Sequence, residues 1–233
     1  VSKGTVSSTG DNVGGLVGEN YNGIVQASGS MANVTGKNNT GGLIGRIEAR
    51  YGNPFVMNCY AQGNITGSNR AGGLIGYNYI YSGISTVRNC YASGKINDGT
   101  GSGLIGTNNG HVYNCYYRYL NTGSTPGYSV TTEALKTQST YYMWDFDNIW
   151  EIDGGYPYIS IRGTDGTVVF DGAGTPSNPY LIKTEEQLYF IAMDDSGRFL
   201  NNETVNFQLA NDIEITTKYW TPIGIYQQFK GVF

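Results

Sequence analysis

Few residues in this chain have side chains that could carry catalytic or metal chemistry. There are three cysteines, and His111 is the single histidine. The cysteines are Cys59, Cys90 and Cys115, and no two of them form a CxxC pair. Their spacing argues against a zinc site, and their odd number argues against a disulfide framework. His111 has no acid or nucleophile near it in the sequence, so we interpret it as a solvated turn residue. We predict no metal site and no cofactor.

Cleavage of a polysaccharide would require carboxylates or basic groups clustered on one face. Asp145 and Asp147 lie among aromatic residues, and their segment lacks the oxygen ligand and the glycine of a calcium loop. None of the candidate groups recurs in phase with a repeat. The sequence therefore predicts no catalytic residue and a protein that is not an enzyme. The pairs considered are Asp145 with Asp147, Asp194 with Asp195, and Arg88 with Arg118.

Aromatic residues are the strongest candidates for binding, since the chain has 20 tyrosines. They gather in two stretches, and tyrosine rings can stack on sugars or on a protein partner. The alternative is that these rings only cover and stiffen the side of the fold, and both interpretations stay open. The candidate ligand-binding residues are Tyr51, Phe55, Tyr77, Tyr79 and Tyr81.

The composition limits the other partner classes. Charged residues make up 14% of the chain and the net charge is -4, which is too sparse and too acidic for binding nucleic acid or an anionic membrane. The 35 glycines indicate many turns, while 39% hydrophobic residues argue against disorder. No apolar run is long enough for a membrane span and no signal peptide is visible, so we expect a processed chain or a part of a larger one.

A repeat positions these residues. Gly14-Gly15-Leu16-Val17-Gly18 recurs with Leu43, Leu74 and Leu104 at the leucine position, at intervals of 27, 31 and 30 residues. A second element, Asn58-Cys59-Tyr60-Ala61, recurs around Cys90 and Cys115, and Ser28 takes the same place in the first unit. A third apolar position follows the Cys position by six residues, as at Ile65.

Each unit thus contains three short strand-like pieces separated by turn-forming Gly, Asn, Ser and Asp. Stacking the units as coils would bury their apolar sides and pair each strand in parallel with its copy, about 4.8 Å away. We therefore predict an all-β, right-handed parallel β-helix of about four coils. Paired glycines would let the chain turn corners without a Cβ clash. The expected inward ladders are Leu16/Leu43/Leu74/Leu104, Ser28/Cys59/Cys90/Cys115 and Val34/Ile65/Ile96, with the cysteines as buried free thiols.

Insertions collect at one corner of the predicted coil. From the Leu to the Cys position the four units span 12, 16, 16 and 11 residues, and the two longer loops hold the candidate aromatic residues. Solenoid proteins often bind partners through such insertions. The predicted site is therefore a pair of adjacent aromatic loops.

The Gly-Gly-Leu-Ile-Gly core followed by Asn-Cys-Tyr-Ala resembles the GLUG motif, which is found in tandem in large bacterial surface and adhesin-like proteins. The resemblance extends over about residues 1–123. It implies secretion, display on a bacterial cell surface, and an adhesive or structural role. It implies no catalytic residues.

The pattern fades after residue 123. Residues 124–163 contain an aromatic block with Trp144, Phe146, Trp150 and Tyr158, which we expect to cover the last open coil. Residues 164–233 look like a linker and the start of a second module. Its predicted elements are a strand at 180–182, a helix at about 185–193 with a Thr184/Gln187 capping box, strands at 206–210 and 213–215, and a further coil from Trp220.

Three functional classes stay open from the sequence. We favour a non-catalytic, extracellular module for adhesion or scaffolding that binds a glycan or an extracellular protein. The alternatives are a filament subunit joined head-to-tail through its open ends and, less favoured, a polysaccharide-active enzyme. Nucleic-acid binding and membrane insertion are not expected.

Overall fold

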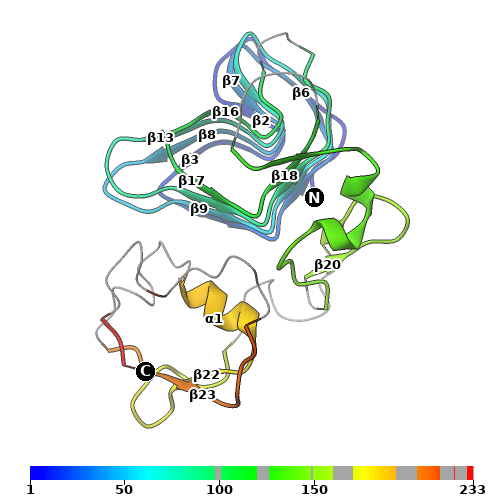
Figure 1. Cartoon of the computed structure of the whole chain (residues 1–233). Helices are drawn as coiled ribbons and strands as arrows, with labels where there is room; N and C mark the ends of the chain where they lie inside the picture. Colours follow the sequence, from blue (N-terminus) through cyan, green and yellow to red (C-terminus); the bar gives the residue numbers. More distant parts are fainter. Residues whose placement is uncertain are drawn as a thin grey trace. The chain divides into compact units, whose positions relative to one another are not determined.

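The computed structural model describes most of the chain (Figure 1), and contacts divide it into two units, Val1–Gly166 and Thr167–Phe233. Asp194, Asp195 and most of the coil expected from Trp220 lie outside the described residues. The described residues are 1–97, 101–119, 126–147, 149–159, 170–192, 204–215, 223 and 230–232.

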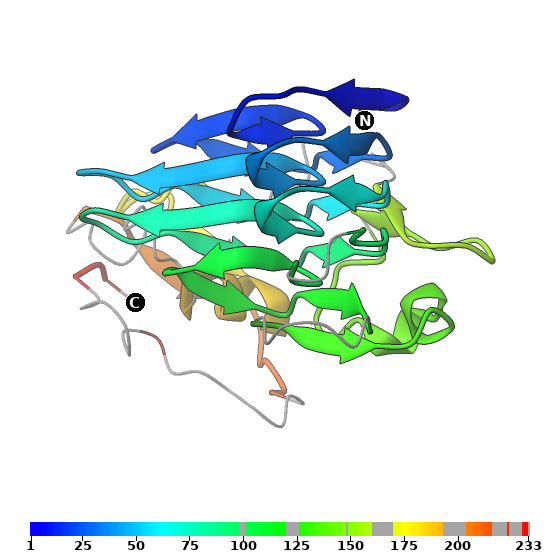
Figure 2. The same ribbon diagram turned by 90° about the horizontal axis from the view of Figure 1, so that it is seen from above.

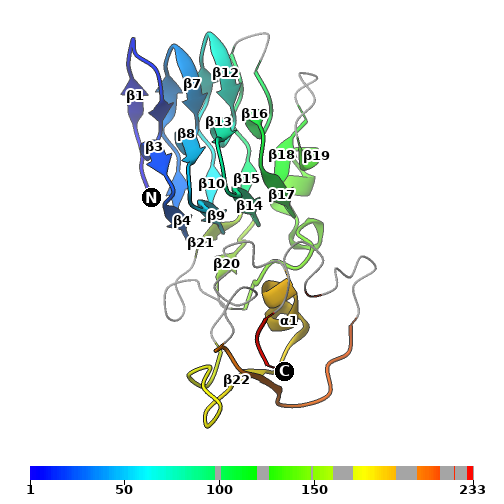
Figure 3. The same ribbon diagram turned by 90° about the vertical axis from the view of Figure 1, so that its left-hand side faces the viewer.

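The first unit is a parallel β-solenoid. In Figure 3 its coils follow one another along the stack from β1 to β19, and Figure 2 shows the same layers in chain order. Every strand pairing between coils is parallel, so the predicted all-β parallel β-helix is confirmed. Its right-handed sense stays a prediction.

Coils 1 to 3 have more strands than the three pieces expected from the sequence, because the chain bends at further corners. We number as coils 1 to 4 the turns that contain Leu16, Leu43, Leu74 and Leu104. Coil 2 shows the complete set: β7 (Asn38–Gly41), β8 (Ile44–Ala49), β9 (Phe55–Met57), β10 (Tyr60–Ala61) and β11 (Ile65–Thr66).

The other coils repeat this order. Coil 1 has β2 (Val13–Gly14), β3 (Val17–Tyr21), β4 (Ile24–Gln26), β5 (Gly29–Ser30) and β6 (Asn33–Thr35). Coil 3 has β12 (Asn69–Gly72), β13 (Ile75–Ile80), β14 (Thr86–Arg88) and β15 (Tyr91–Ala92). Coil 4 has β16 (Ile105–Asn108), β17 (His111–Tyr113) and β18 (Tyr116–Arg118).

Partial turns extend the stack at both ends. Strand β1 (Thr5–Ser7) pairs with β6, and β19 (Tyr128–Val130) pairs with β18. The solenoid therefore has about six turns when these are counted, rather than the four expected from the leucine repeat. The sequence undercounted because neither partial turn contains the Gly-Gly-Leu signature.

The paired glycines form a corner that no other residue fits. A Cβ atom at Gly41 would lie 1.9 Å from the Ile44 carbonyl oxygen, and one at Gly72 would lie 1.9 Å from that of Ile75. The second glycine is equally confined, because a Cβ at Gly42 would lie 2.2 Å from the Gly73 oxygen in the next coil. The predicted role of the paired glycines is confirmed.

The asparagine of the Asn-Cys-Tyr-Ala element makes a second corner. Asn58, Asn89 and Asn114 have φ values of 52°, 49° and 47°, a left-handed conformation that asparagine tolerates better than most residues. After this bend the chain alternates, so that the cysteine points inward, the tyrosine outward and the alanine inward. The motif is therefore a corner followed by a strand with one buried face.

The three cysteines stack in the core as free thiols. The Sγ atom of Cys90 donates to the Arg88 carbonyl at 3.0 Å and lies 3.8 Å from the Val56 carbonyl of the preceding coil. In coil 1 the Ser28 hydroxyl donates to the Gln26 carbonyl at 2.8 Å, the equivalent bond. Burial, together with the neighbouring thiols of Cys115 and Cys59, raises the pKa of the Cys90 thiol.

The leucine ladder is buried in coils 2 to 4 but not in coil 1. Leu43, Leu74 and Leu104 are fully buried, whereas Leu16 is 44% exposed although its amide donates to the Leu43 carbonyl. Leu16 keeps the register, but among the described residues no further coil covers its side chain. The expectation of four buried leucines was wrong for this one.

The aromatic block does not cover the end of the solenoid as expected. Residues 131–159, which we call the flanking segment, pack on the outer face of the sheet β19-β18-β15-β10-β5 (Figure 1). Its buried residues Trp144 and Trp150 contact the outward rings of coils 2 to 4, since Trp150 lies 6.2 Å from Tyr60 and Trp144 lies 5.9 Å from Tyr116.

Hydrogen bonds fix the flanking segment to the coils. The Tyr91 hydroxyl donates to the Pro157 carbonyl at 2.5 Å, and the Trp144 indole donates to the Asn114 carbonyl at 3.0 Å. Burial raises the pKa of Tyr91 well above its usual value, so this phenol stays a donor. Phe146 is partly buried in the same cluster, and Tyr158 on β21 (Tyr158–Ile159) is 39% exposed.

Coil 4 has one large ring in its interior, that of Tyr117. Tyr117 takes the inward position that Ser30, Ala61 and Ala92 hold in coils 1 to 3. A Cβ atom at Gly103 would lie 2.1 Å from its ring. Tyr117 thus occupies the core where the regular coils end.

The second unit contains a short parallel pairing with a helix between its strands. Strand β22 (Tyr180–Ile182) pairs with β23 (Phe207–Leu209), and α1 (Glu185–Ala192) lies between them in the chain. The Thr184/Gln187 capping box is confirmed by reciprocal bonds of 3.2 and 3.3 Å. Residues 213–215 form no strand, which corrects that prediction.

We predict that removing a ring of the flanking segment destabilises the solenoid. Trp150→Ala deletes a buried indole that contacts two coils, so the free energy of unfolding should fall by about 3–5 kcal/mol in equilibrium denaturation. Tyr142→Ala, at a 41% exposed ring on the same segment, is the matched control and should change little. An unchanged Trp150→Ala midpoint would contradict the packing described.

We also predict that the three thiols are unreactive in the folded protein. Around pH 8.5 about half of an exposed cysteine is thiolate, whereas the raised pKa of Cys90 keeps it protonated. All three cysteines are fully buried, so a thiol-specific chromogenic reagent should modify none of them until denaturant is added, and then all three. Lys95→Cys, at an exposed position, provides the reactive control.

Candidate binding face

The outer face of the sheet β16-β13-β8-β3 carries most of the predicted ligand-binding residues. Along β8, Ile47 and Ala49 are buried inward, while Arg46 and Glu48 point outward. Strand register places Tyr77 beside Arg46, and Tyr79 beside Glu48. The alternation of a strand therefore puts Tyr77 and Tyr79 on the same face, and their rings lie 5.4 Å apart.

Tyr77 and Tyr79 on β13, and Tyr81 directly after this strand, each have a guanidinium group over the ring. Arg70 lies 4.4 Å from the Tyr77 centroid, Arg46 lies 5.5 Å from that of Tyr79, and Arg50 lies 5.2 Å from that of Tyr81. These distances are those of cation–π contacts. We call Arg46, Arg50, Arg70, Tyr77, Tyr79 and Tyr81 the arginine–tyrosine face.

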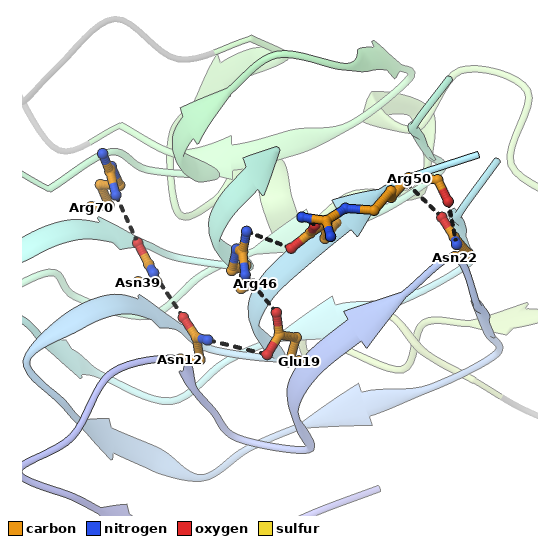
Figure 4. A network of polar contacts seen from close by, with 8 residues as sticks. Asn12, Glu19, Asn22, Asn39, Arg46, Arg50 and Arg70 are labelled. Carbon is orange, nitrogen blue, oxygen red and sulfur yellow. Dashed lines mark hydrogen bonds and ion pairs between the residues drawn. The ribbon is translucent and has the colours of Figure 1, made fainter. Parts of the chain in front are cut away.

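Two glutamates, Glu19 and Glu48, form ion pairs with Arg46 and Arg50. Figure 4 labels Glu19 and both of these arginines. Arg46 pairs with Glu19 at 2.7 Å and with Glu48 at 2.5 Å. The other oxygen of Glu48 pairs with Arg50 at 2.6 Å, although Arg50 keeps 46% of its side chain exposed. The Glu48 side chain is 5% exposed, so its negative charge acts within this network. The positive charge of Arg46 lies between the carboxylates of Glu19 and Glu48, which neutralise it.

The corner loops beside this face are tied to their neighbours. The Asn22 side chain bonds both the carbonyl and the amide of Arg50, at 2.7 and 2.8 Å, as a paired strand would (Figure 4). The next residue, Tyr51, is tied to coil 3, because its amide donates to the Ser82 hydroxyl at 3.0 Å. The exposed rings of Tyr51 and Tyr81 meet edge to face at 6.1 Å. The loops therefore present their rings in a fixed arrangement.

One side of the face is left open by the short corner of coil 4. Strand β13 pairs with β8 as far as Ile80, but it pairs with β16 only as far as Asn78. No residue of coil 4 is therefore in register with Tyr79 or Tyr81. The unequal loop lengths seen in the sequence thus create a ridge two coils wide, with aromatic residues along its edge.

Arg70 occupies an unusual backbone position. Asn12 and Asn39 hold the same place in coils 1 and 2, with φ values of 55° and 52°, and Asn39 donates to Asn12 at 2.7 Å. Arg70 continues this ladder with φ of 52°, a conformation that arginine adopts far less readily than asparagine. Its exposed guanidinium donates to Asn39 at 3.4 Å and covers Tyr77.

The structure brings together four of the five predicted aromatic residues. Tyr51, Tyr77, Tyr79 and Tyr81 lie along the arginine–tyrosine face or its corner. Phe55 lies instead on β9 in the neighbouring sheet, partly buried and 6.0 Å from the Arg88 guanidinium. Phe55 therefore does not belong to this face.

Sequence reasoning missed the arginines and glutamates of this face. The sequence argument rested on charges that repeat in every unit, whereas each of these charges appears once, and its partners lie in its own coil or in the neighbouring one. The available signal was alternation, since Arg46, Glu48 and Arg50 occupy every second position in one unit and Tyr77, Tyr79 and Tyr81 do so in the next.

The candidate catalytic pairs lie elsewhere. The Asp145 carboxylate accepts the Asp147 amide at 3.0 Å in a turn of the flanking segment. Arg88 is on β14 and Arg118 on β18, in different sheets, and the His111 ring lies 6.0 Å from Tyr113. Within the described ranges, no cluster of three His, Cys, Asp or Glu side chains that could hold a metal is found, and no helix has the length and hydropathy of a membrane span.

Comparison with known proteins agrees with the repeat. Residues 67–97 match the model of the GLUG motif, and this segment is one turn of the solenoid, from the start of coil 3 through Ile96. No curated protein and no solved structure gives a significant match. The register places the Gly-Gly-Leu segments of coils 1, 2 and 4 in line with the matched one. The chain is therefore a β-solenoid repeat protein that carries the GLUG motif.

Proposed function

We propose that this protein is a non-catalytic binding module for adhesion or scaffolding at a bacterial cell surface, and that it binds through the arginine–tyrosine face. The observation that carries the proposal is the set of three arginine–tyrosine pairs at the two tyrosines of β13 and at Tyr81, which follows this strand. Tyrosine and arginine are the residue types enriched at the energetic centres of interfaces. A glycan or an extracellular protein is the expected ligand.

Stability alone gives a weak reason for this arrangement. Exposed cation–π contacts contribute about 0.5–1 kcal/mol, and exposed ion pairs about 0–1 kcal/mol. Tyr51 is 83% exposed and Tyr81 is 59% exposed, so these rings bury little surface in the solenoid. Adjacent exposed rings held by ordered loops are typical of a binding surface, because the loops lose little further freedom when a ligand binds.

The extracellular bacterial setting rests on the GLUG resemblance. The non-catalytic assignment is supported by the use of Asp145 within its own turn and of Glu48 within an arginine network.

We predict that binding of the intact chain to an array of glycans and extracellular-matrix proteins depends on the corner tyrosines. Tyr79→Ala/Tyr81→Ala should weaken binding roughly 5- to 30-fold, as expected for contacts worth about 1–2 kcal/mol. Tyr119→Ala, at a 62% exposed ring on another sheet, is the matched control and should bind like the wild type. A ligand held equally well by both variants would place the site elsewhere, and a wild type that binds nothing would refute the proposed function.

Self-association is a second candidate, favoured by the apolar side chains at the edge of coil 1. Leu16 is 44% exposed and Ile24 is 64% exposed, beside strand edges that could pair with a second copy. Light scattering should then show a mass that rises with concentration and that falls to the monomer in Leu16→Glu. A wild-type monomer at all concentrations would exclude this candidate.

A further inference from the structure

We propose that the ligand of the arginine–tyrosine face is a linear anionic glycan, lying along β13 with an acidic group at each of Arg70 and Arg50 and an uncharged sugar ring on Tyr79. This inference rests on the proposed function and names the class of its ligand. The shared chemistry is a carboxylate or sulfate carried by alternate sugars.

The charges of the face are uneven along the strand. In the middle, Arg46 is bridged by both Glu19 and Glu48 and adds no uncompensated charge. Arg50, at one end, shares Glu48 with Arg46 and is half exposed. Arg70, at the other end, is exposed, and its described contacts are with Tyr77 and the Asn39 amide, which are uncharged. Arg46, Arg50, Glu19 and Glu48 together carry no net charge, so Arg70 is the cation of the face with no carboxylate among its described contacts, and Arg50 is a half-exposed guanidinium that shares one carboxylate with Arg46.

The spacing of these ends fits an extended polymer. Arg70 lies over Tyr77 and Arg50 over Tyr81, four residues further along the chain, which corresponds to about 13 Å at about 3.3 Å per residue. Tyr79 lies between them with no residue of coil 4 in register beside it. A short run of linked sugar rings covers such a span, and a pyranose ring can stack on a tyrosine that is partly exposed, as Tyr79 is.

The backbone of Arg70 gives an independent argument. The ladder position favours asparagine, yet coil 3 places arginine there in the left-handed conformation. A residue in a backbone conformation that it adopts less readily than its counterparts in coils 1 and 2 is the kind of outlier that motivates a functional hypothesis. What the arginine adds is one exposed guanidinium, which can form paired hydrogen bonds with a carboxylate or sulfate.

Arg70→Asn therefore separates a structural role from a binding role. It removes the charge but restores the residue that coils 1 and 2 use at this corner, so the thermal midpoint of unfolding should stay the same or rise. Combined with Arg50→Gln, it should weaken binding of an acidic glycan roughly tenfold or more. Lys37→Gln/Lys95→Gln removes the same charge from exposed lysines off the face and is the matched control.

The experiment is a titration of the intact chain with three size-matched linear oligosaccharides. One alternates uronic acids with neutral sugars, the second is its carboxyl-reduced form, and the third carries sulfates in place of carboxylates. We expect the wild type to bind the uronate or the sulfated form, with affinity that falls as salt rises, and not the reduced form. Binding of only one acidic form identifies the source of the charge.

The outcomes separate this inference from the proposed function. Equal binding of the reduced glycan, or binding of a protein ligand alone, with loss in Tyr79→Ala/Tyr81→Ala, would overturn the anionic glycan and leave the binding face intact. Loss of uronate binding in the lysine control as much as in Arg50→Gln/Arg70→Asn would show unspecific charge attraction and also overturn it. The comparison of natural and reduced glycan requires no variant, so it holds even if a variant fails to fold.

Discussion

Exact stacking of corners is the constraint on which this structure depends. Parallel strands pair along the solenoid only if every coil bends at the same places. The bends are made by glycines that have no room for a Cβ and by asparagines in the left-handed conformation. A corner displaced by one residue would turn every following side chain to the opposite face. For this reason the same residue types recur at the corners of successive coils. The loops differ in length from coil to coil, because the strands on either side of them are already paired.

As a consequence, residues of the core can vary less from coil to coil than residues of the outer faces. Inside, each position contacts its own copies above and below, so size must be kept from coil to coil, as the stacked cysteines show. Outside, a side chain contacts the next coil in its own column or the one beside it, as Arg46 does with Tyr79, and one coil can differ from the next. The arginine–tyrosine face uses this freedom, since glutamate, arginine, tyrosine and threonine follow one another in a single column from Glu19 to Thr107.

Sequence periodicity predicted the parallel solenoid, the glycine corners, the cysteine ladder and the helix with its capping box, because each is specified by residues close together in the chain or by identical copies. It failed for the flanking segment, where Trp144 and Trp150 contact tyrosines from three different coils and no local pattern encodes which face they cover. It also found the tyrosines of the candidate site but not their arginines, because the pairing of unlike residues across coils has no period.

Tyr117 marks the place in the chain where the regular coils stop. The inward position two residues after the cysteine position holds a small residue in coils 1 to 3, namely Ser30, Ala61 and Ala92. In coil 4 a phenol ring takes that place against Gly103, and among the described residues β19 is the one strand that pairs beyond it. The column that is uniform in size through three coils therefore changes at the same coil in which the Gly-Gly-Leu repeat ends, while the asparagine corner at Asn114 is kept.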